Sequence, residues 1–249
     1  MDTALRVQQD GRGDPLLLLV HGLGATGDVW QGWWPLLTRS WLGRWVAPDL
    51  PGHGGSAPSP PYTFDSFAAA VTEVVDPASP TLVVGHSLGG VVGLALAGSR
   101  FLNIRAVVGL GIKVEWTDEE LQRAKGLSQR PPTWFATREE AVARYLRVSG
   151  LAGLMADDNA AIDAGIVERD GKWGLAMDPA TFGVGAPDMP ALLAASAARV
   201  LLVRGEHDQM NTDQQLRALG APTFTLPGLG HNAHVENPAA VLSLLDRFR

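Results

Sequence analysis

Short apolar runs recur along the chain and predict buried strands. Leu16–Val20 is apolar at every position and lies between Gly13-Asp14-Pro15 and His21-Gly22. Such a run indicates a strand with both faces buried, as in the centre of a parallel sheet. Further candidate strands span residues 44–48, 81–85, 105–109, 200–203 and 223–226. Helical patterns such as 64–75 and 88–97 separate them. This alternation predicts an α/β fold, in which helices cover both faces of a mostly parallel sheet.

The pattern changes after Gly111. Residues 117–120 and 137–140 each match the T-x-x-E capping box, and an amphipathic stretch follows each of them. We expect helices without intervening strands up to about Ala198, after which the strand pattern returns. The chain ends in a helix that Asn237-Pro238 should cap.

These patterns divide the chain into a core and one insertion. Residues 1–111 and 191–249 are predicted to form the α/β core. Residues 112–190 are predicted to form a helical cap inserted into it.

Composition narrows the class of protein. The chain has 249 residues, of which 46% are hydrophobic, and it contains no cysteine. This length supports one compact core without disulfides, and thiol nucleophiles and thiolate metal sites are excluded. The net charge of −6, with no basic block, argues against nucleic acid as a partner.

The longest apolar run, Leu16–Val20, is far shorter than the ~20 residues of a membrane helix. Residues 1–6 lack the basic start and apolar stretch of a signal peptide. We therefore expect a cytoplasmic protein with no membrane segment. The sequence leaves its oligomeric state open.

One short motif points to nucleophilic catalysis. Gly85-His86-Ser87-Leu88-Gly89 follows the candidate strand 81–84 and precedes the apolar helix 91–97. This is the strand, turn and helix setting of the G-x-S-x-G nucleophile elbow. Side chains at positions 85 and 89 would collide with neighbouring elements in so tight a turn, which explains the two glycines.

With this motif the sequence resembles the α/β-hydrolase family over most of the chain outside the cap. His21-Gly22-Leu23-Gly24 is similar to the family's oxyanion-loop motif, and residues 49–56 are similar to its D-x-P-G-x-G-x-S turn. Residues 205–208 and 228–231 resemble its acid and histidine loops, and all four segments occur in the family's order. The resemblance implies a hydrolase fold and a serine-dependent reaction.

A serine hydroxyl needs a general base, and that base needs an orienting acid. His231 and Asp208 fit these roles because each follows a predicted strand, so both fall at the sheet edge where Ser87 lies. His234 is the alternative base, and we expect it to pack beside the final helix. The alternative acids are Glu206, Asp178 and Asp188.

The oxyanion of a tetrahedral intermediate needs hydrogen-bond donors. The natural pair is the backbone N–H of Leu88, directly after the nucleophile, and that of Leu23. No H-E-x-x-H or similar ligand spacing occurs, so we expect no metal and no cofactor. His21 is expected to order its loop, His53 to brace the glycine-rich turn and His86 to pack beside the nucleophile turn.

Aromatic residues are candidates for the substrate pocket. Trp116, Trp134 and Phe135 lie in the predicted cap, where they could form an apolar roof over Ser87 together with Trp173, Met155 and Phe182. Trp30, near the oxyanion loop, is a further candidate. The other tryptophans between residues 33 and 45 are expected to pack in the core.

These residues predict a small-molecule enzyme that cleaves a small, largely apolar carboxylic ester or lactone through an acyl-enzyme on Ser87. The same residues permit thioester or C–C bond hydrolysis, perhydrolysis, release of an amino-terminal residue, or a lyase reaction. A non-catalytic small-molecule receptor is the rival from another class, although no triad member is missing.

Overall fold

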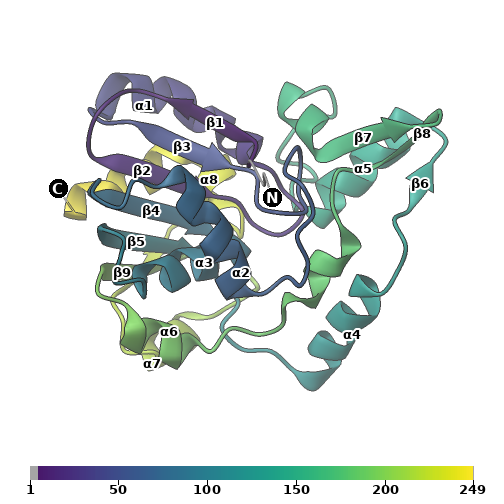
Figure 1. Ribbon diagram of the computed structural model, residues 1–249. Coiled ribbons are helices and arrows are strands. Elements are labelled where there is room, and N and C mark those ends of the chain that lie inside the picture. The colour runs from purple at the N-terminus through teal and green to yellow at the C-terminus, as the bar shows by residue number, and fades with distance from the viewer. Residues whose placement is uncertain (1–4, 249) are drawn as a thin grey trace.

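The computed structural model describes residues 5–248 and contains a seven-stranded sheet (Figure 1). The strand order is β1-β3-β2-β4-β5-β9-β10, and every neighbouring pair is parallel except β1 with β3. The strands are β1 (Val7–Asp10), β2 (Leu16–Val20), β3 (Trp45–Pro48), β4 (Thr81–His86), β5 (Ile104–Leu110), β9 (Arg199–Gly205) and β10 (Thr223–Leu226). The predicted fold class is confirmed.

All six predicted strands of this sheet are present, and β1 is an addition. β1 contains one apolar residue, Val7, and its two last residues are exposed. It pairs with β3 at the edge of the sheet, where polar side chains face water. An edge strand of this composition carries no hydrophobic pattern from which it could be predicted.

Residues 1–4 and 249 lie outside the described part of the chain. The first four belong to the segment on which the expectation of no signal peptide rests. Among residues 5–248, no helix has the length and the apolar character that crossing a bilayer requires.

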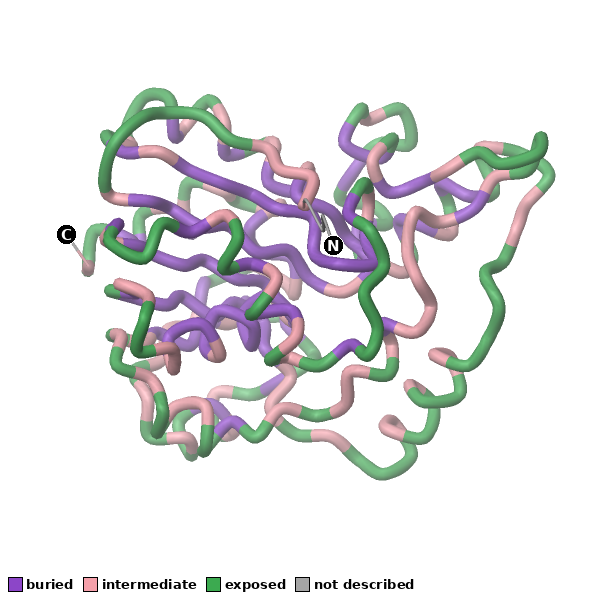
Figure 2. The backbone as a smooth tube through the Cα atoms, viewed as in Figure 1, coloured by how far each residue is buried: buried purple, intermediate pink, exposed green. Residues whose placement is uncertain are grey.

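Helices cover both faces of the sheet, and the central strands are buried between them (Figure 2). Leu17 and Leu19 of β2 pack into one hydrophobic cluster, while Leu16 and Leu18 pack into the other. The alternation of side chains across a strand explains why β2 is apolar at every position. The core helices are α1 (Trp34–Ser40), α2 (Phe64–Val71), α3 (Leu88–Ala97), α6 (Met189–Ala195), α7 (Asp213–Ala218), α8 (Ala233–Glu236) and α9 (Pro238–Leu242).

The insertion after β5 contains strands as well as helices. Its elements are α4 (Asp118–Ser128), β6 (Trp134–Phe135), α5 (Arg138–Val148), η3 (Ala160–Gly165), β7 (Ile166–Arg169), β8 (Lys172–Leu175) and η4 (Pro179–Val184), where η marks a 3₁₀ helix. Both predicted capping boxes are present at the starts of α4 and α5. Figure 1 shows this part of the chain beside the carboxyl ends of the core strands.

The prediction of an insertion built from helices alone is wrong, because β6, β8 and β7 form a three-stranded antiparallel sheet. Asp170-Gly171 connects β7 to β8, and both residues have positive φ, at 51° and 71°. An Asp-Gly pair in this conformation is a tight hairpin turn. The dipeptide was therefore a sequence signal for the hairpin.

Backbone and side-chain hydrogen bonds hold the insertion against the core. The Gly54 N–H donates to the Ala176 carbonyl at 2.7 Å, and the Asp178 N–H donates to that of Gly52 at 2.8 Å. The predicted end of the insertion at residue 190 falls inside α6, whose Met189 is buried in a core cluster. The exact division between cap and core stays a prediction.

Candidate active site

Ser87 lies on the sharp turn between β4 and α3. Its backbone has φ 50° and ψ −114°, and Asp170 is the other non-glycine residue with positive φ among residues 5–248. Such a conformation costs free energy and persists only where surrounding contacts hold it. Here the Ser87 N–H donates to the Leu110 carbonyl of the neighbouring strand at 2.7 Å.

The two glycines of the motif are required by contact distances. A Cβ on Gly85 would lie 2.2 Å from the Gly89 carbonyl oxygen. A Cβ on Gly89 would lie 2.2 Å from the Val20 carbonyl oxygen. Any side chain at either position would force β4, α3 and β2 apart, so the steric reason expected from the sequence holds.

Asp208 and His231 form a pair at the ends of β9 and β10. His231 Nδ1 lies 3.1 Å from Asp208 Oδ1, which also accepts a hydrogen bond from the Met210 N–H at 2.8 Å. The Asp208 side chain is fully buried, and its Oδ2 has no hydrogen-bond partner within the described residues. A buried carboxylate in this position fixes Nδ1 as the protonated nitrogen and leaves Nε2 to accept a proton.

The structure brings Ser87 to the same sheet edge, at the end of β4, but its hydroxyl makes no hydrogen bond to any residue between 5 and 248. Catalytic hydrogen bonds often form only when substrate is bound.

Gly111 is a residue of this site that the sequence analysis missed. It follows β5, between the strands that carry Ser87 and Asp208, and has φ +59°. A Cβ there would lie 3.0 Å from His231 Nδ1 and 3.2 Å from Asp208 Oδ2. The chain therefore passes so close to the imidazole and carboxylate that a Cβ at position 111 would displace them by a few tenths of an ångström. A glycine two residues after the predicted central strand 105–109 was the available signal.

His234 is placed as a packing residue. It is buried, its ring lies 4.5 Å from that of Trp30, and neither ring nitrogen has a hydrogen-bond partner within residues 5–248. Burial lowers the pKa of His234 to about 3, so the imidazole is neutral at ordinary pH. It makes no contact with Asp208 that could orient it as a base.

The alternative acids have other partners. Glu206 accepts a hydrogen bond from the Gly228 N–H at 2.8 Å, and Asp178 accepts one from the Tyr62 hydroxyl at 2.8 Å. Asp188 caps α6 by accepting from the Ala191 N–H.

Two other histidines hold the loops of the site. His86 Nε2 donates to the His231 carbonyl at 3.0 Å, and burial lowers the pKa of His86 well below its usual value. His21 Nδ1 donates to the Gly22 carbonyl at 2.8 Å, while its Nε2 accepts from the Leu50 N–H at 2.9 Å. Both rings stay neutral and fix backbone positions around Ser87.

The expected oxyanion donors lie beside the nucleophile. The Leu88 N–H is the first of α3, so no earlier turn of that helix supplies an acceptor for it. Leu23 follows β2, the neighbour of β4. Both leucines line the same cavity as Ser87.

This cavity is small and mostly apolar. It measures about 70 Å³ and is lined by Leu23, Phe64, Ser87, Leu88, Val91, Lys113, Trp116, Val184, Gly185 and Pro187. Lys113 is the one charged residue in its lining. The Lys113 ammonium lies 2.8 Å from Glu120 and also over the Trp116 ring, 5.3 Å from its centre.

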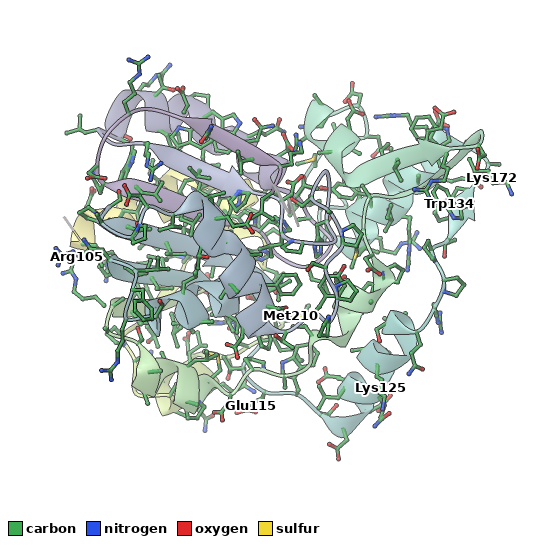
Figure 3. All side chains as sticks on the ribbon, in the orientation of Figure 1. Arg105, Glu115, Lys125, Trp134, Lys172 and Met210 are labelled. Carbon is green, nitrogen blue, oxygen red and sulfur yellow. The ribbon has the colours of Figure 1, made fainter. Side chains whose placement is uncertain are left out.

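Of the predicted pocket aromatics, Trp116 lines this cavity and the other three do not. Trp30 is fully buried and packs edge-on against Trp33, with ring centres 5.0 Å apart. Figure 3 shows Trp134 on the outer part of the insertion, near Lys172 and away from Met210, which follows Asp208 by two residues. Phe135 lines a separate cavity inside the insertion. Sequence patterns do not report which way a loop or short strand turns its side chains.

Among residues 5–248, no group of three or more histidine, aspartate or glutamate side chains is placed to hold a metal ion. The chemistry supported by the site is that of the serine, imidazole and carboxylate groups.

A sequence model of the alpha/beta hydrolase family matches residues 17–244. The protein belongs to that family and is an α/β-hydrolase enzyme, as its sequence resemblance predicted.

Curated relatives differ in reaction. The chain is 28% identical to a 2-succinyl-6-hydroxy-2,4-cyclohexadiene-1-carboxylate synthase of Klebsiella pneumoniae over 98% of both chains. It is 31% identical to the enzyme of that name from Escherichia coli strain SE11, over 94% of this chain and 93% of that one. A pimeloyl-[acyl-carrier protein] methyl ester esterase of Methylococcus capsulatus is 40% identical, over 37% of this chain and 35% of that one.

Solved structures share the fold. The E-2-(acetamidomethylene)succinate hydrolase superposes with a TM-score of 0.80 at 23% identity and covers 98% of this chain and 94% of its own. A marine microorganism esterase gives 0.75 at 18% identity over the whole of both chains.

Proposed function

We propose that this protein is a serine hydrolase that cleaves a small carboxylic ester or lactone through an acyl-enzyme on Ser87. The observation that carries the proposal is the pairing of His231 Nδ1 with the buried Asp208 carboxylate at 3.1 Å, beside the strained turn that presents Ser87. These are the base, the orienting acid and the nucleophile of acyl transfer.

The reaction follows from these positions. His231 Nε2 accepts the Ser87 hydroxyl proton as Oγ attacks the ester carbonyl carbon, and Asp208 stabilises the imidazolium. The carbonyl oxygen becomes an oxyanion, which accepts hydrogen bonds from the N–H groups of Leu88 and Leu23. His231 returns the proton to the leaving alcohol, and water then releases the acid by the same steps in reverse.

The cavity beside Ser87 supports a short acyl group next to the scissile bond. Its volume of about 70 Å³ leaves room for few atoms, and most of its wall is apolar. Trp116 and Val184 would contact that group directly. Any larger part of a substrate must lie beyond this cavity.

A lyase reaction is the second candidate, because relatives matched over nearly the whole chain are named as synthases. The product in their name carries a succinyl group and a ring carboxylate. Recognition of two carboxylates beside the nucleophile would require cations there. The single cation of the Ser87 cavity, Lys113, is already paired with Glu120. This favours ester hydrolysis.

The test has two arms. A fluorophosphonate should label the wild-type protein and not Ser87→Ala, whereas a non-catalytic receptor would stay unlabelled. Hydrolysis of p-nitrophenyl esters from acetate upward should then be fastest with short acyl groups. Formation of the relatives' diene product without any ester hydrolysis would replace the ester proposal with the lyase.

A further inference from the structure

The end of α5, in the insertion, lies against two loops of the proposed catalytic machinery. α5 ends at Val148, and a Cβ on Gly24, in the oxyanion loop, would lie 2.6 Å from Val148 Cγ1. Two residues further on, the Gly150 carbonyl accepts a hydrogen bond from the side-chain amide of Asn232 at 2.9 Å. Asn232 directly follows His231. One end of one helix therefore contacts both the oxyanion loop and the loop that carries the base.

The core holds this helix in place. The buried residues of α5 lie in the same hydrophobic cluster as Leu17 and Leu19 of the central strand β2; they are Ala141, Val142, Tyr145 and Leu146. Groups supported by a packed helix are held more precisely than groups on a free loop. The end of α5 is therefore a fixed point to which a loop can be attached.

The side chain of Asn232 makes its hydrogen bond to the insertion and not to its own helix. Asn232 is the N-cap residue of α8, a position where asparagine commonly accepts a hydrogen bond from the first turn. It makes no such bond here. The residue is buried, and its amide donates to a carbonyl 82 residues away in the sequence. The bond joins the residue after His231 to the insertion.

This contact also explains the glycine at position 150. A Cβ on Gly150 would lie 2.9 Å from Asn232 Nδ2, so a side chain there would push the amide away. Gly153 has a similar positive φ, 78° against 72°, but a Cβ on Gly153 has open space around it. The backbone conformation favours glycine at both positions, and the close approach to Asn232 distinguishes Gly150 from Gly153.

His231 is held by a hydrogen bond at its backbone and another at its ring. His86 Nε2 donates to the His231 carbonyl at 3.0 Å, and Asp208 Oδ1 lies 3.1 Å from Nδ1. The course of the chain after His231 also affects where Nε2 lies relative to Ser87. A displacement of about 1 Å at a reacting group can reduce a rate by about 100-fold.

We infer that Asn232 is a positioning residue of the proposed reaction. Its hydrogen bond to Gly150 ties the loop of His231 to the end of α5 and keeps the imidazole where Nε2 can accept the Ser87 proton. The insertion then supports the chemical step in addition to forming walls of the cavity. This inference rests on the proposed function and adds a residue to its machinery.

Asn232→Ala removes the amide and tests the inference. We expect kcat for a p-nitrophenyl ester to fall about tenfold or more while KM stays near the wild-type value, because the base is displaced and the pocket is not. The rate of labelling by a fluorophosphonate should fall by a similar factor, since that reaction needs the same base. Gly150 is exposed, so water can bind its carbonyl in the variant, and a thermal melt should show a folded protein.

Gly150→Ala and Gly153→Ala are a matched pair. Both place alanine at a positive φ, but of the two only the Cβ at 150 meets Asn232. We expect kcat to fall in Gly150→Ala and to stay near the wild-type value in Gly153→Ala. When Asn232→Ala is combined with Gly150→Ala, the new Cβ has no amide to displace. The double variant should therefore lose no more kcat than Asn232→Ala alone.

Unchanged kcat in either Asn232→Ala or Gly150→Ala, or losses that multiply in the double variant, would overturn the inference while leaving ester hydrolysis in place. Gly150→Ala carries the test if Asn232→Ala does not fold, because it disturbs the contact without emptying a buried position.

Proton NMR separates this inference from the proposed function. The proton on His231 Nδ1, which is hydrogen-bonded to Asp208, should give a low-field signal that is absent in His231→Ala. The signal should be sharp in the wild type and in Gly153→Ala, and faster exchange with water should broaden it in Asn232→Ala and Gly150→Ala. An equally sharp signal in all four proteins would show that Asn232 does not position the imidazole. If the wild type is neither labelled nor active on esters, the proposed function fails, and this signal decides the role of Asn232 alone.

Discussion

At the scale of single residues, the site depends on positions where close contacts hold the backbone in one conformation. Ser87 keeps a positive φ because Gly85 and Gly89 let β4, α3 and β2 approach within contact distance. The strain is local, so removal of the Ser87 hydroxyl should leave the turn intact.

Ser87→Ala should fold like the wild type and lose at least ~10³-fold in turnover of any accepted ester, because both half-reactions need Oγ. Turnover of a p-nitrophenyl ester and a thermal melt measure the two effects. Retention of more than a tenth of the activity by a folded variant would contradict the covalent mechanism.

His231→Ala and His234→Ala should separate catalysis from packing. Loss of His231 should reduce turnover about as much as loss of Ser87, since only this imidazole contacts Asp208. Loss of the buried His234 should cost about 1–3 kcal/mol of unfolding free energy, with a much smaller effect on turnover. The reverse order in kcat/KM would make His234 the base.

Gly111→Ala tests the close approach of the chain to the acid and base. Both Gly111 and Gly153 have positive φ, so alanine should cost about 1 kcal/mol of stability at either position. Only at 111 would the new Cβ meet His231 and Asp208, because a Cβ on Gly153 has open space around it.

We therefore expect kcat for a p-nitrophenyl ester to fall at least tenfold in Gly111→Ala and to stay near the wild-type value in Gly153→Ala. Similar kcat values in the two variants would show that Gly111 is needed only for its backbone conformation and not for its close approach to His231 and Asp208.

At the scale of elements, the connection between β5 and α4 and the helix η4 form the walls beside Ser87. Trp116 belongs to the first and Val184 to the second, and the capping box at Thr117 fixes where α4 begins. The strand β6 lies further out, so its aromatic residues serve other contacts; Arg169, for example, lies over the Trp134 ring.

Trp116→Ala should enlarge the Ser87 cavity and move the preferred acyl group toward longer chains. Trp134→Ala is the matched control and should keep the wild-type profile. A methylene that such a pocket does not accommodate changes the free energy of transition-state binding by roughly 1–3 kcal/mol. The kcat/KM ladder of p-nitrophenyl esters measures both variants, and an unchanged profile for Trp116→Ala would remove this residue from the pocket.

At the scale of the whole molecule, buried histidines make the stability of the fold depend on pH. Burial lowers the pKa of His21 to about 4 and those of His53 and His234 to about 3. In the unfolded chain each takes up a proton near pH 6.5. Between pH 6.5 and about 4 the unfolded state thus binds more protons, and stability falls as the pH falls.

In urea unfolding at several pH values, the contribution of these histidines to the free energy of unfolding should be complete above pH 6.5. It should decline as the pH falls below that value. His234→Ala should reduce the slope between pH 6 and 4 by about 1 kcal/mol per pH unit, because one titrating group is gone. An identical slope in the variant would mean that His234 is already protonated in the folded protein.

The sequence by itself determined six of the seven strands of the sheet, the nucleophile turn and the family. A buried parallel strand must be apolar on both faces, so the sequence of Leu16–Val20 is enough to predict it. A tight turn must carry glycine where two backbones are in contact, so the spacing of Gly85 and Gly89 is enough to predict the turn. The order of Ser87, Asp208 and His231 along the chain also needed no coordinates to be noticed, since each follows a predicted strand.

Tertiary structure alone decided which side chains face the site. Trp30 and Trp116 are the same residue type, yet one is fully buried beside Trp33 and the other lines the Ser87 cavity. The pairing of β6 with β8 and the approach of Gly111 to His231 join segments distant in sequence. Such contacts depend on how separate elements pack, and hydrophobic periodicity describes each element alone.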